Sequence, residues 1–181
     1  MKVNLGAGSD ILTGYINHDL LALPGIDVVH NLNQYPWPWA DGSIEEIKMF
    51  DVLEHLDNFM QAMEEIFRVL MPGGHCLVSV PYWNSWCAYA DPTHKRGFHE
   101  ITFRFFDPES IYCQERPYYT RARFKIVYEE FIVAPFSPYF SIPGVAEISV
   151  SRAWSKNVIG LIGNYFISNL IHDLRLTLKK P

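Results

Sequence analysis

The chain begins with a short apolar strand that leads directly into two glycines. Residues 2–5 read Lys-Val-Asn-Leu, and Gly6-Ala7-Gly8 follows at once. Because glycine has no side chain, backbone N–H groups in such a turn can come close to a ligand. Asp19 closes the next short strand, where an acidic side chain can accept hydrogen bonds from ribose hydroxyls. This order favours an α/β fold that binds a nucleotide-type ligand.

Three further motifs follow in order along the chain. Residues 38–43 read Pro-Trp-Ala-Asp-Gly-Ser, residues 53–55 read Leu-Glu-His, and residues 68–74 read Arg-Val-Leu-Met-Pro-Gly-Gly. Together with the glycine turn, this series resembles the class I S-adenosylmethionine-dependent methyltransferases, and most closely their small bacterial-type members. The resemblance covers residues 2–107, and four motifs in the right order argue against a chance similarity.

Strands separated by helical or loop crossovers indicate an α/β fold with a doubly wound, Rossmann-like and mostly parallel sheet. The closing strands resemble the antiparallel ones of the family, which brings the expected sheet to seven strands. These strands are expected at residues 2–5, 15–19, 26–30, 44–50, 75–80, 123–133 and 145–151. The gap between the first two strands is too short for the usual crossover helix, so we expect a shortened first helix.

Apolar residues at helical spacing predict a helix from Asn58 to Leu70, with one face packed on the sheet. Asp57 or Asn58 can cap its start, and residues 72–74, Pro-Gly-Gly, stop it. Residues 82–106 are rich in aromatic side chains and have no clean period, so we interpret them as a long loop or irregular cover. Asp107-Pro108 is expected to start a short helix.

We expect a methyltransferase-like domain in residues 1–152 and a separate C-terminal segment in residues 153–181. The stretch from Trp154 to Leu178 is interpreted as an amphipathic helix with a weak pattern. Its most apolar part, residues 158–171, is too short and too polar to span a bilayer. We expect it to pack on its own domain or on a partner copy, which would make a homo-oligomer. An interfacial membrane helix is the alternative.

Composition limits the class of protein and the type of partner. At 181 residues, with 49% hydrophobic and 19% charged residues, the chain is expected to be one ordered globular domain. The net charge of −5 argues against a nucleic-acid partner, since phosphate binding needs clustered Lys and Arg. Cys76, Cys87 and Cys113 form no CxxC pair, and no leader sequence precedes the first strand, so a cytoplasmic location is expected.

The resemblance implies S-adenosyl-L-methionine as the cofactor. It places the amino-acid tail and ribose at the glycine turn and on Asp19, and the adenine near Asn31 and Leu32. Asn4 stands where the family commonly has Asp or Glu, so it keeps hydrogen bonds but loses an ion pair. The residues expected to bind the cofactor are Asn4, Gly6, Ala7, Gly8, Asp19, Asn31, Leu32, Phe50, Asp51 and His55.

The polar segment after the strand at 75–80 offers candidates for chemistry on the acceptor. Asp91 could orient His94 as a general base that removes a proton from an accepting hydroxyl or amine. The alternative is an Asp–His hydrogen bond that only braces the loop. His94, His99, Asp91 and Glu100 could also be read as metal ligands, but no helical His pair frames them, and no metal is expected.

These observations favour a methyltransferase that acts on a small molecule or a glycan precursor by direct methyl transfer. The alternative is a non-catalytic module or partner subunit that binds S-adenosylmethionine or a nucleotide. The two asparagines, Asn4 and Asn31, and the shortened first helix favour this alternative slightly. A nicotinamide-dependent dehydrogenase is disfavoured because the glycine pattern stops at Gly-x-Gly.

Overall fold

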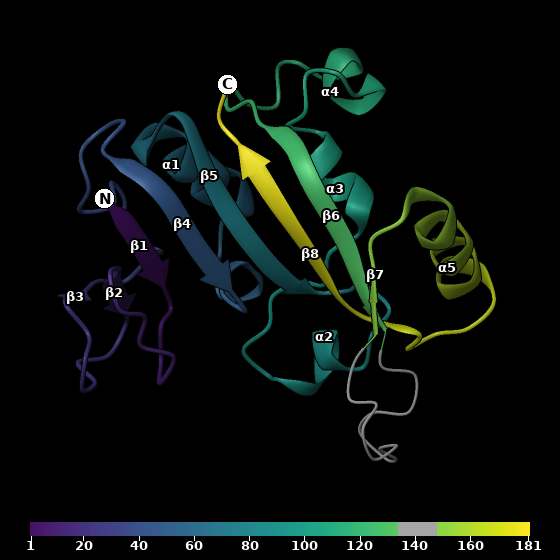
Figure 1. Cartoon of the computed structure of the whole chain (residues 1–181), viewed down its shortest axis with the longest axis horizontal. Coiled ribbons are helices and arrows are strands. Elements are labelled where there is room, and N and C mark those ends of the chain that lie inside the picture. The colour runs from purple at the N-terminus through teal and green to yellow at the C-terminus, as the bar shows by residue number, and fades with distance from the viewer. Residues whose placement is uncertain (134–147) are drawn as a thin grey trace.

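The computed structural model describes residues 1–133 and 148–181, and its centre is one sheet (Figure 1). Eight strands form this sheet within the described residues, in the order β3-β2-β1-β4-β5-β8-β6-β7. Their bounds are β1 Lys2–Leu5, β2 Ile16–Asp19, β3 Val28–Val29, β4 Ile44–Phe50, β5 Leu70–Pro81, β6 Lys125–Val133, β7 Ile148–Val150 and β8 Ile171–Lys179.

The first five strands are parallel, and the last three are antiparallel to their neighbours. The parallel pairs are β1 with β2 and β4, β2 with β3, and β4 with β5. Strand β8 runs antiparallel to both β5 and β6, and β6 runs antiparallel to β7. The expected mostly parallel α/β sheet with antiparallel closing strands is therefore confirmed. The expected number of seven strands is one short of the eight described.

The additional strand lies where a helix was expected. Helix α5 spans Ala153–Tyr165, and the chain then forms β8, so the prediction of one helix from Trp154 to Leu178 is wrong in its second half. Leu174, Leu176 and Leu178 alternate with polar residues and are fully or almost fully buried. Because side chains of a strand point alternately to its two faces, this spacing fits a strand with one face in the core. The segment 153–181 thus contributes a strand to the middle of the sheet.

The connection from β1 to β2 is short and held by asparagines. A shortened helix was expected here, but no helix forms in residues 6–15, all of which the structure describes. The Asn4 side-chain amide donates hydrogen bonds to the Asp10 carbonyl at 2.8 Å and to Asn17 Oδ1 at 3.2 Å. Asn17 Oδ1 also accepts from the Leu12 N–H at 2.9 Å. Two buried amides therefore replace a helix in fixing this loop.

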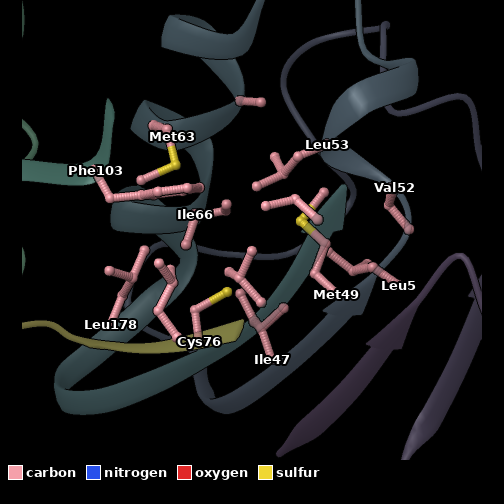
Figure 2. Packing of buried hydrophobic residues seen from close by; sticks show 14 of the residues in the cluster. Leu5, Ile47, Met49, Val52, Leu53, Met63, Ile66, Cys76, Phe103 and Leu178 are labelled. Carbon is pink, nitrogen blue, oxygen red and sulfur yellow. The ribbon is translucent and has the colours of Figure 1, made fainter. Parts of the chain in front are cut away.

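Helix α1, Phe59–Val69, carries the chain from β4 to β5 behind the sheet in the view of Figure 1. The Asn58 side chain caps its start by accepting a hydrogen bond from the Gln61 N–H, as predicted. Met63 and Ile66 are fully buried against sheet residues such as Ile47 and Cys76 (Figure 2). Strand β5 starts directly after the helix, at Leu70, five residues earlier than expected.

Two short helices, α2 Cys87–Ala90 and α3 Glu100–Arg104, divide the segment 82–106 that was interpreted as a long loop. Outside this segment, the 3-10 helix η1 Leu53–His55 precedes α1, and helix α4 spans Ile111–Glu115. The helix expected from Asp107 begins four residues later, at Ile111. The His99 side chain accepts a hydrogen bond from the Ile101 N–H and so caps α3. Among the described residues, no helix is long and apolar enough to cross a membrane.

Candidate functional site

The sheet creates a crevice between β1 and β4. From β1 the chain moves outward through β2 and β3, and from β4 it moves the opposite way to β5. Such a reversal of strand order opens a crevice at the carboxyl ends of the two central strands, where ligands bind in α/β sheets. A cavity of about 640 Å³ lies at this point, a size typical of cofactor sites. Its walls are Gly6, His18, Asp19, Leu20, His30, Asn31, Leu32, Asn33, Asp51, Val52, His55, Leu56, Asp57, Pro92, Thr93 and Lys95.

A second cavity of similar size, about 650 Å³, is a weaker candidate. It lies between α1 and residues 117–122, with Phe67 in its wall. The Phe67 carbonyl accepts a hydrogen bond from Lys180, just after the end of β8. Since β8 is antiparallel to β5, this cavity lies at the amino end of the parallel strands. The sheet topology therefore points to the cavity between β1 and β4.

The glycine turn is shaped by two different constraints. Gly6 has φ +66°, and a Cβ there would lie 2.4 Å from Val52 Cγ2, so no side chain fits. Gly8 has φ +52°, and a Cβ there would meet no described atom within 4 Å. Its N–H donates a 2.8 Å hydrogen bond to Asp19 Oδ2. The Asp19 carboxylate thus joins the end of β2 to the glycine turn and remains in the cavity wall.

The structure brings together six of the ten residues expected to bind the cofactor. These six line the cavity: Gly6, Asp19, Asn31, Leu32, Asp51 and His55. The other four are not among the lining residues and have different contacts. Asn4 braces the β1–β2 loop, Ala7 donates its N–H to the His18 carbonyl, Gly8 holds Asp19, and Phe50 lies under the Lys48 ammonium.

His18 lines this cavity and was missed by the sequence analysis. It lies on β2, is 1% exposed, and its Nε2 bonds the His30 carbonyl at 3.0 Å. The ring meets Trp39 edge-on, with 5.5 Å between ring centroids. Burial lowers the pKa of His18 below its usual value, against smaller raising effects of the His30 carbonyl and Asp19. Its position one residue before Asp19 was the available signal.

A smaller cavity of about 370 Å³ adjoins the first one, and Asp51 and His55 line both. Its remaining walls are Glu54, Pro81, Trp86, Cys87, Ala90, Asp91, His94, His172 and Asp173. Asp51 has φ +55°, a left-handed conformation that costs energy for a residue with a side chain. Burial and the nearby Asp173 carboxylate raise the pKa of Asp51. A strained acidic residue therefore stands between the two cavities.

The predicted pair of Asp91 and His94 has a different arrangement. Asp91 Oδ1 accepts hydrogen bonds from the Thr93 hydroxyl at 2.6 Å and from the Thr93 N–H at 2.7 Å. The Thr93 oxygen lies 2.9 Å from His55 Nδ1. Asp91 therefore reaches His55 through Thr93, while the link to His94 is a backbone bond from the His94 N–H to the Asp91 carbonyl. Both expected residues line the smaller cavity, as does His55.

Glu54 lies in the wall of the smaller cavity and was not singled out from the sequence. Its side chain is 1% exposed, and within residues 1–133 and 148–181 no other residue donates a hydrogen bond to its two oxygens. Burial raises the pKa of Glu54 to about 8. A carboxyl group with this environment is costly to bury, which is typical of functional sites.

Two residues of the metal set considered from the sequence have structural roles away from the smaller cavity's walls. Besides capping α3, His99 lies 3.1 Å from Glu100 through Nδ1. Glu100 Oε2 accepts a 2.6 Å hydrogen bond from the Tyr82 hydroxyl. His94 and Asp91 line the cavity, so the four residues do not form one cluster in the described chain.

Sequence comparisons find methyltransferases among known proteins. A family model described as "Methyltransferase domain" matches residues 21–78. Over 75 residues the chain is 40% identical to a "Probable S-adenosylmethionine-dependent methyltransferase" of Mycolicibacterium smegmatis. This match covers 41% of the chain and 28% of the relative, so the chain spans less than a third of that relative's length.

Solved structures share the fold over nearly the whole chain. A SAM-dependent methyltransferase from Archaeoglobus fulgidus superposes with a TM-score of 0.63 at 17% identity, over 99% of this chain and 85% of that one. A chain from the complex of the Haloferax volcanii Trm112 methyltransferase activator with a methyltransferase gives 0.56 at 16% identity, over 99% and 82%. At these identities the likeness shows the fold alone.

Proposed function

We propose that this chain is a class I S-adenosylmethionine-dependent methyltransferase, which binds S-adenosylmethionine between β1 and β4 and transfers its methyl group to an acceptor in the adjoining cavity. The observation that carries the proposal is the glycine turn and the Asp19 carboxylate on one cavity at the strand-order reversal. When bound, the cofactor supplies an electrophilic methyl group on a sulfonium centre.

The residues of the cavity between β1 and β4 fit this cofactor. Asp19 has a carboxylate that can accept hydrogen bonds from ribose hydroxyls, and the missing side chain of Gly8 leaves open space beside it. Leu32 is apolar and Asn31 is polar, a combination that suits the face and the edge of an adenine ring. Asp51 adds an acidic group that can face a cationic ligand. We therefore propose that these residues hold the ribose, the adenine and the cationic part of the cofactor in one cavity.

The smaller cavity is the proposed acceptor site. About 370 Å³ suits a small molecule or one sugar unit of a glycan precursor. His94 and the Asp91–Thr93–His55 chain provide groups that can accept a proton from a hydroxyl or amine. Pro81 and Trp86 add apolar walls, which help to exclude water from the reacting groups.

Calorimetry with S-adenosylmethionine, S-adenosylhomocysteine and NAD tests the proposal. We expect the first two to bind and NAD not to bind. Asp19→Ala should weaken binding by about 1–3 kcal/mol, the scale for losing hydrogen bonds to a charged group. A ligand without the ribose hydroxyls should then lose little more affinity in this variant, because both changes remove the same contact.

Gly8→Val is the matched test of the turn. It places a branched side chain in the open space beside Gly8, next to the Asp19 carboxylate, and should abolish binding while the chain stays folded. Micromolar affinity for S-adenosylhomocysteine in this variant would contradict the assignment. If the cofactor binds but no small-molecule or glycan-type acceptor is methylated, the non-catalytic binding module is the better description.

A further inference from the structure

We propose that Glu54, His55 and His94 form a binding site for one divalent transition-metal cation in the wall of the smaller cavity. One ligand atom from each residue lies within 4.8 Å of the other two. Three atoms spaced at 4.8 Å lie about 2.8 Å from their common centre, and metal–ligand distances are about 2.0–2.2 Å. Each atom therefore needs to move by less than about 1 Å to coordinate one ion.

The fold brings these residues together from two distant segments. Glu54 and His55 lie on η1, directly after β4. The Lys95 N–H donates a 2.7 Å hydrogen bond to the Glu54 carbonyl and so pins the segment after α2 against η1. The rings of His55 and His94 then meet edge-on, with 4.7 Å between their centroids. The cluster is thus held by backbone and ring contacts that do not involve the proposed ligand atoms of Glu54.

Glu54 is the independent observation that points to a cation. Its carboxyl group is 1% exposed, lines the cavity, and meets no hydrogen-bond donor of another residue in the described chain. A buried carboxyl group without a partner is costly, and metal coordination is one of the few ways to compensate a buried negative charge. His94 Nδ1 is likewise buried without a hydrogen-bond partner among the described residues.

The hydrogen bonds around His55 select the tautomer that a metal ligand requires. The Thr93 hydroxyl has one proton, which it donates to Asp91 Oδ1 at 2.6 Å. Its oxygen can therefore only accept at 2.9 Å from His55 Nδ1, which must carry the ring proton of the neutral imidazole. Nε2 is then left with a free lone pair. A carboxylate that orients a ligating histidine from behind in this way is a recurrent feature of metal sites.

A second cluster in the same cavity is a weaker candidate. Cys87, His172 and Asp173 also lie within 4.8 Å of one another through single ligand atoms. However, His172 Nδ1 already bonds Asp173 Oδ2 at 3.0 Å, and the Cys87 sulfur lies 2.9 Å from the Ser85 hydroxyl. The groups of this second cluster are already hydrogen-bonded, whereas the carboxyl oxygens of Glu54 have no hydrogen-bond partner among the described residues.

The donor set indicates the class of ion. Two imidazoles and one carboxylate suit Zn²⁺, Fe²⁺, Co²⁺ and Mn²⁺ better than Ca²⁺ or Mg²⁺, which prefer oxygen ligands. Three protein ligands leave a coordination position open toward the cavity. This site goes beyond methyl transfer, and metal binding can be measured without either the cofactor or an acceptor.

Metal titration of the whole chain tests the proposal. After removal of metals with a chelator, Co²⁺ should bind at one ion per chain and give visible d–d absorption, and Zn²⁺ should compete for the same site. Glu54→Gln and His94→Ala should each weaken Zn²⁺ binding by about a hundredfold or more, measured by calorimetry. Thr93→Val keeps all three ligands but removes the hydroxyl that orients His55, and should cost about tenfold to a hundredfold.

Two histidine variants serve as matched controls. His75→Asn removes a histidine in the middle of β5, which is not among the lining residues of the cavity, and His172→Asn disrupts the second cluster, so both should keep Zn²⁺ affinity within a few-fold. Zn²⁺ should also raise the unfolding temperature of the unmodified chain but not that of Glu54→Gln, which separates lost binding from lost folding. The proposal is overturned by the absence of saturable binding, by binding that survives Glu54→Gln and His94→Ala, or by binding that His172→Asn abolishes.

Discussion

At the scale of single residues, Gly6 shows how the site and the core depend on each other. Its φ is +66°, and a Cβ added at this position would lie only 2.4 Å from Val52 Cγ2, which leaves no room for a methyl group. We expect Gly6→Ala to lower the free energy of unfolding by about 1–3 kcal/mol through overpacking and backbone strain. Denaturant unfolding without ligand measures this loss.

Two further variants separate the causes at Gly6. Adding Val52→Ala to Gly6→Ala removes the Cγ2 atom and should restore part of the stability, which a double-mutant cycle would detect. Gly8→Ala has the same kind of backbone angle but open space around its Cβ, so it should cost less than Gly6→Ala. Equal losses at the two glycines would mean that backbone strain alone matters.

His18 links stability to pH. Burial holds its pKa below the unfolded value of about 6.5, so the unfolded chain binds this proton more readily. The contribution of neutral His18 to the free energy of unfolding is complete above about pH 6.5. It is lost as the pH falls toward the lowered pKa, and the free energy of unfolding then changes by at most about 1.4 kcal/mol per pH unit. His18→Gln keeps a donor for the His30 carbonyl and should flatten this slope. An unchanged pH dependence of unfolding in the variant would contradict the prediction.

Sequence patterns predicted which residues lie at the site better than they predicted the hydrogen-bond partners of those residues. Gly6 and Asp19 were predictable because each directly follows or ends a strand. The bond from Asp91 through Thr93 to His55 was not, because local spacing favoured His94 as the partner. Glu54 was overlooked because its burial depends on the segment around Lys95, some forty positions further along the chain. No local sequence pattern predicts such a contact.

At the scale of elements, α1 depends on a single cap for its start. Asn58 Oδ1 accepts from the Gln61 N–H at 3.1 Å and satisfies one of the free donors of the first turn. Asn58→Ala should destabilise the chain by about 1 kcal/mol, while Asn58→Ser keeps a capping oxygen and should lose much less. Chemical denaturation of both variants compares them. A loss in Asn58→Ser as large as in Asn58→Ala would show that the cap is not the cause.

Periodicity predicted α1 correctly and failed for the C-terminal segment. The buried positions of α1 recur at helical spacing, and Asn58 and residues 72–74 mark its ends. In β8, Leu174, Leu176 and Leu178 alternate strictly, which is the spacing of a strand. This short signal follows directly on the helical pattern of α5, so the two merged into one apparent amphipathic helix. The part of the expected strand at 145–151 that precedes Ile148 lies outside the described residues.

At the scale of the whole molecule, β8 joins the two halves of the sheet. It pairs with β5 from Pro81 to His75 on one side and with β6 on the other. Removal of residues 170–181 should leave β5 and β6 without their common neighbour and abolish cooperative unfolding, as followed by circular dichroism and hydrogen exchange. Removal of exposed Pro181 alone is the control and should leave the unfolding transition intact. A cooperative transition in the longer truncation would contradict this role.

The place of β8 also determines what the chain exposes while it is being made. Ribosomes synthesise proteins from the amino end, so β5 emerges long before its neighbour β8. Until then one side of β5 presents unpaired backbone N–H and C=O groups, which can pair with strands of other nascent chains. The parallel half of this sheet must therefore wait, with an open edge, for the last of the eight strands. Conditions that slow translation through residues 82–170 would prolong this interval and increase the need for molecular chaperones.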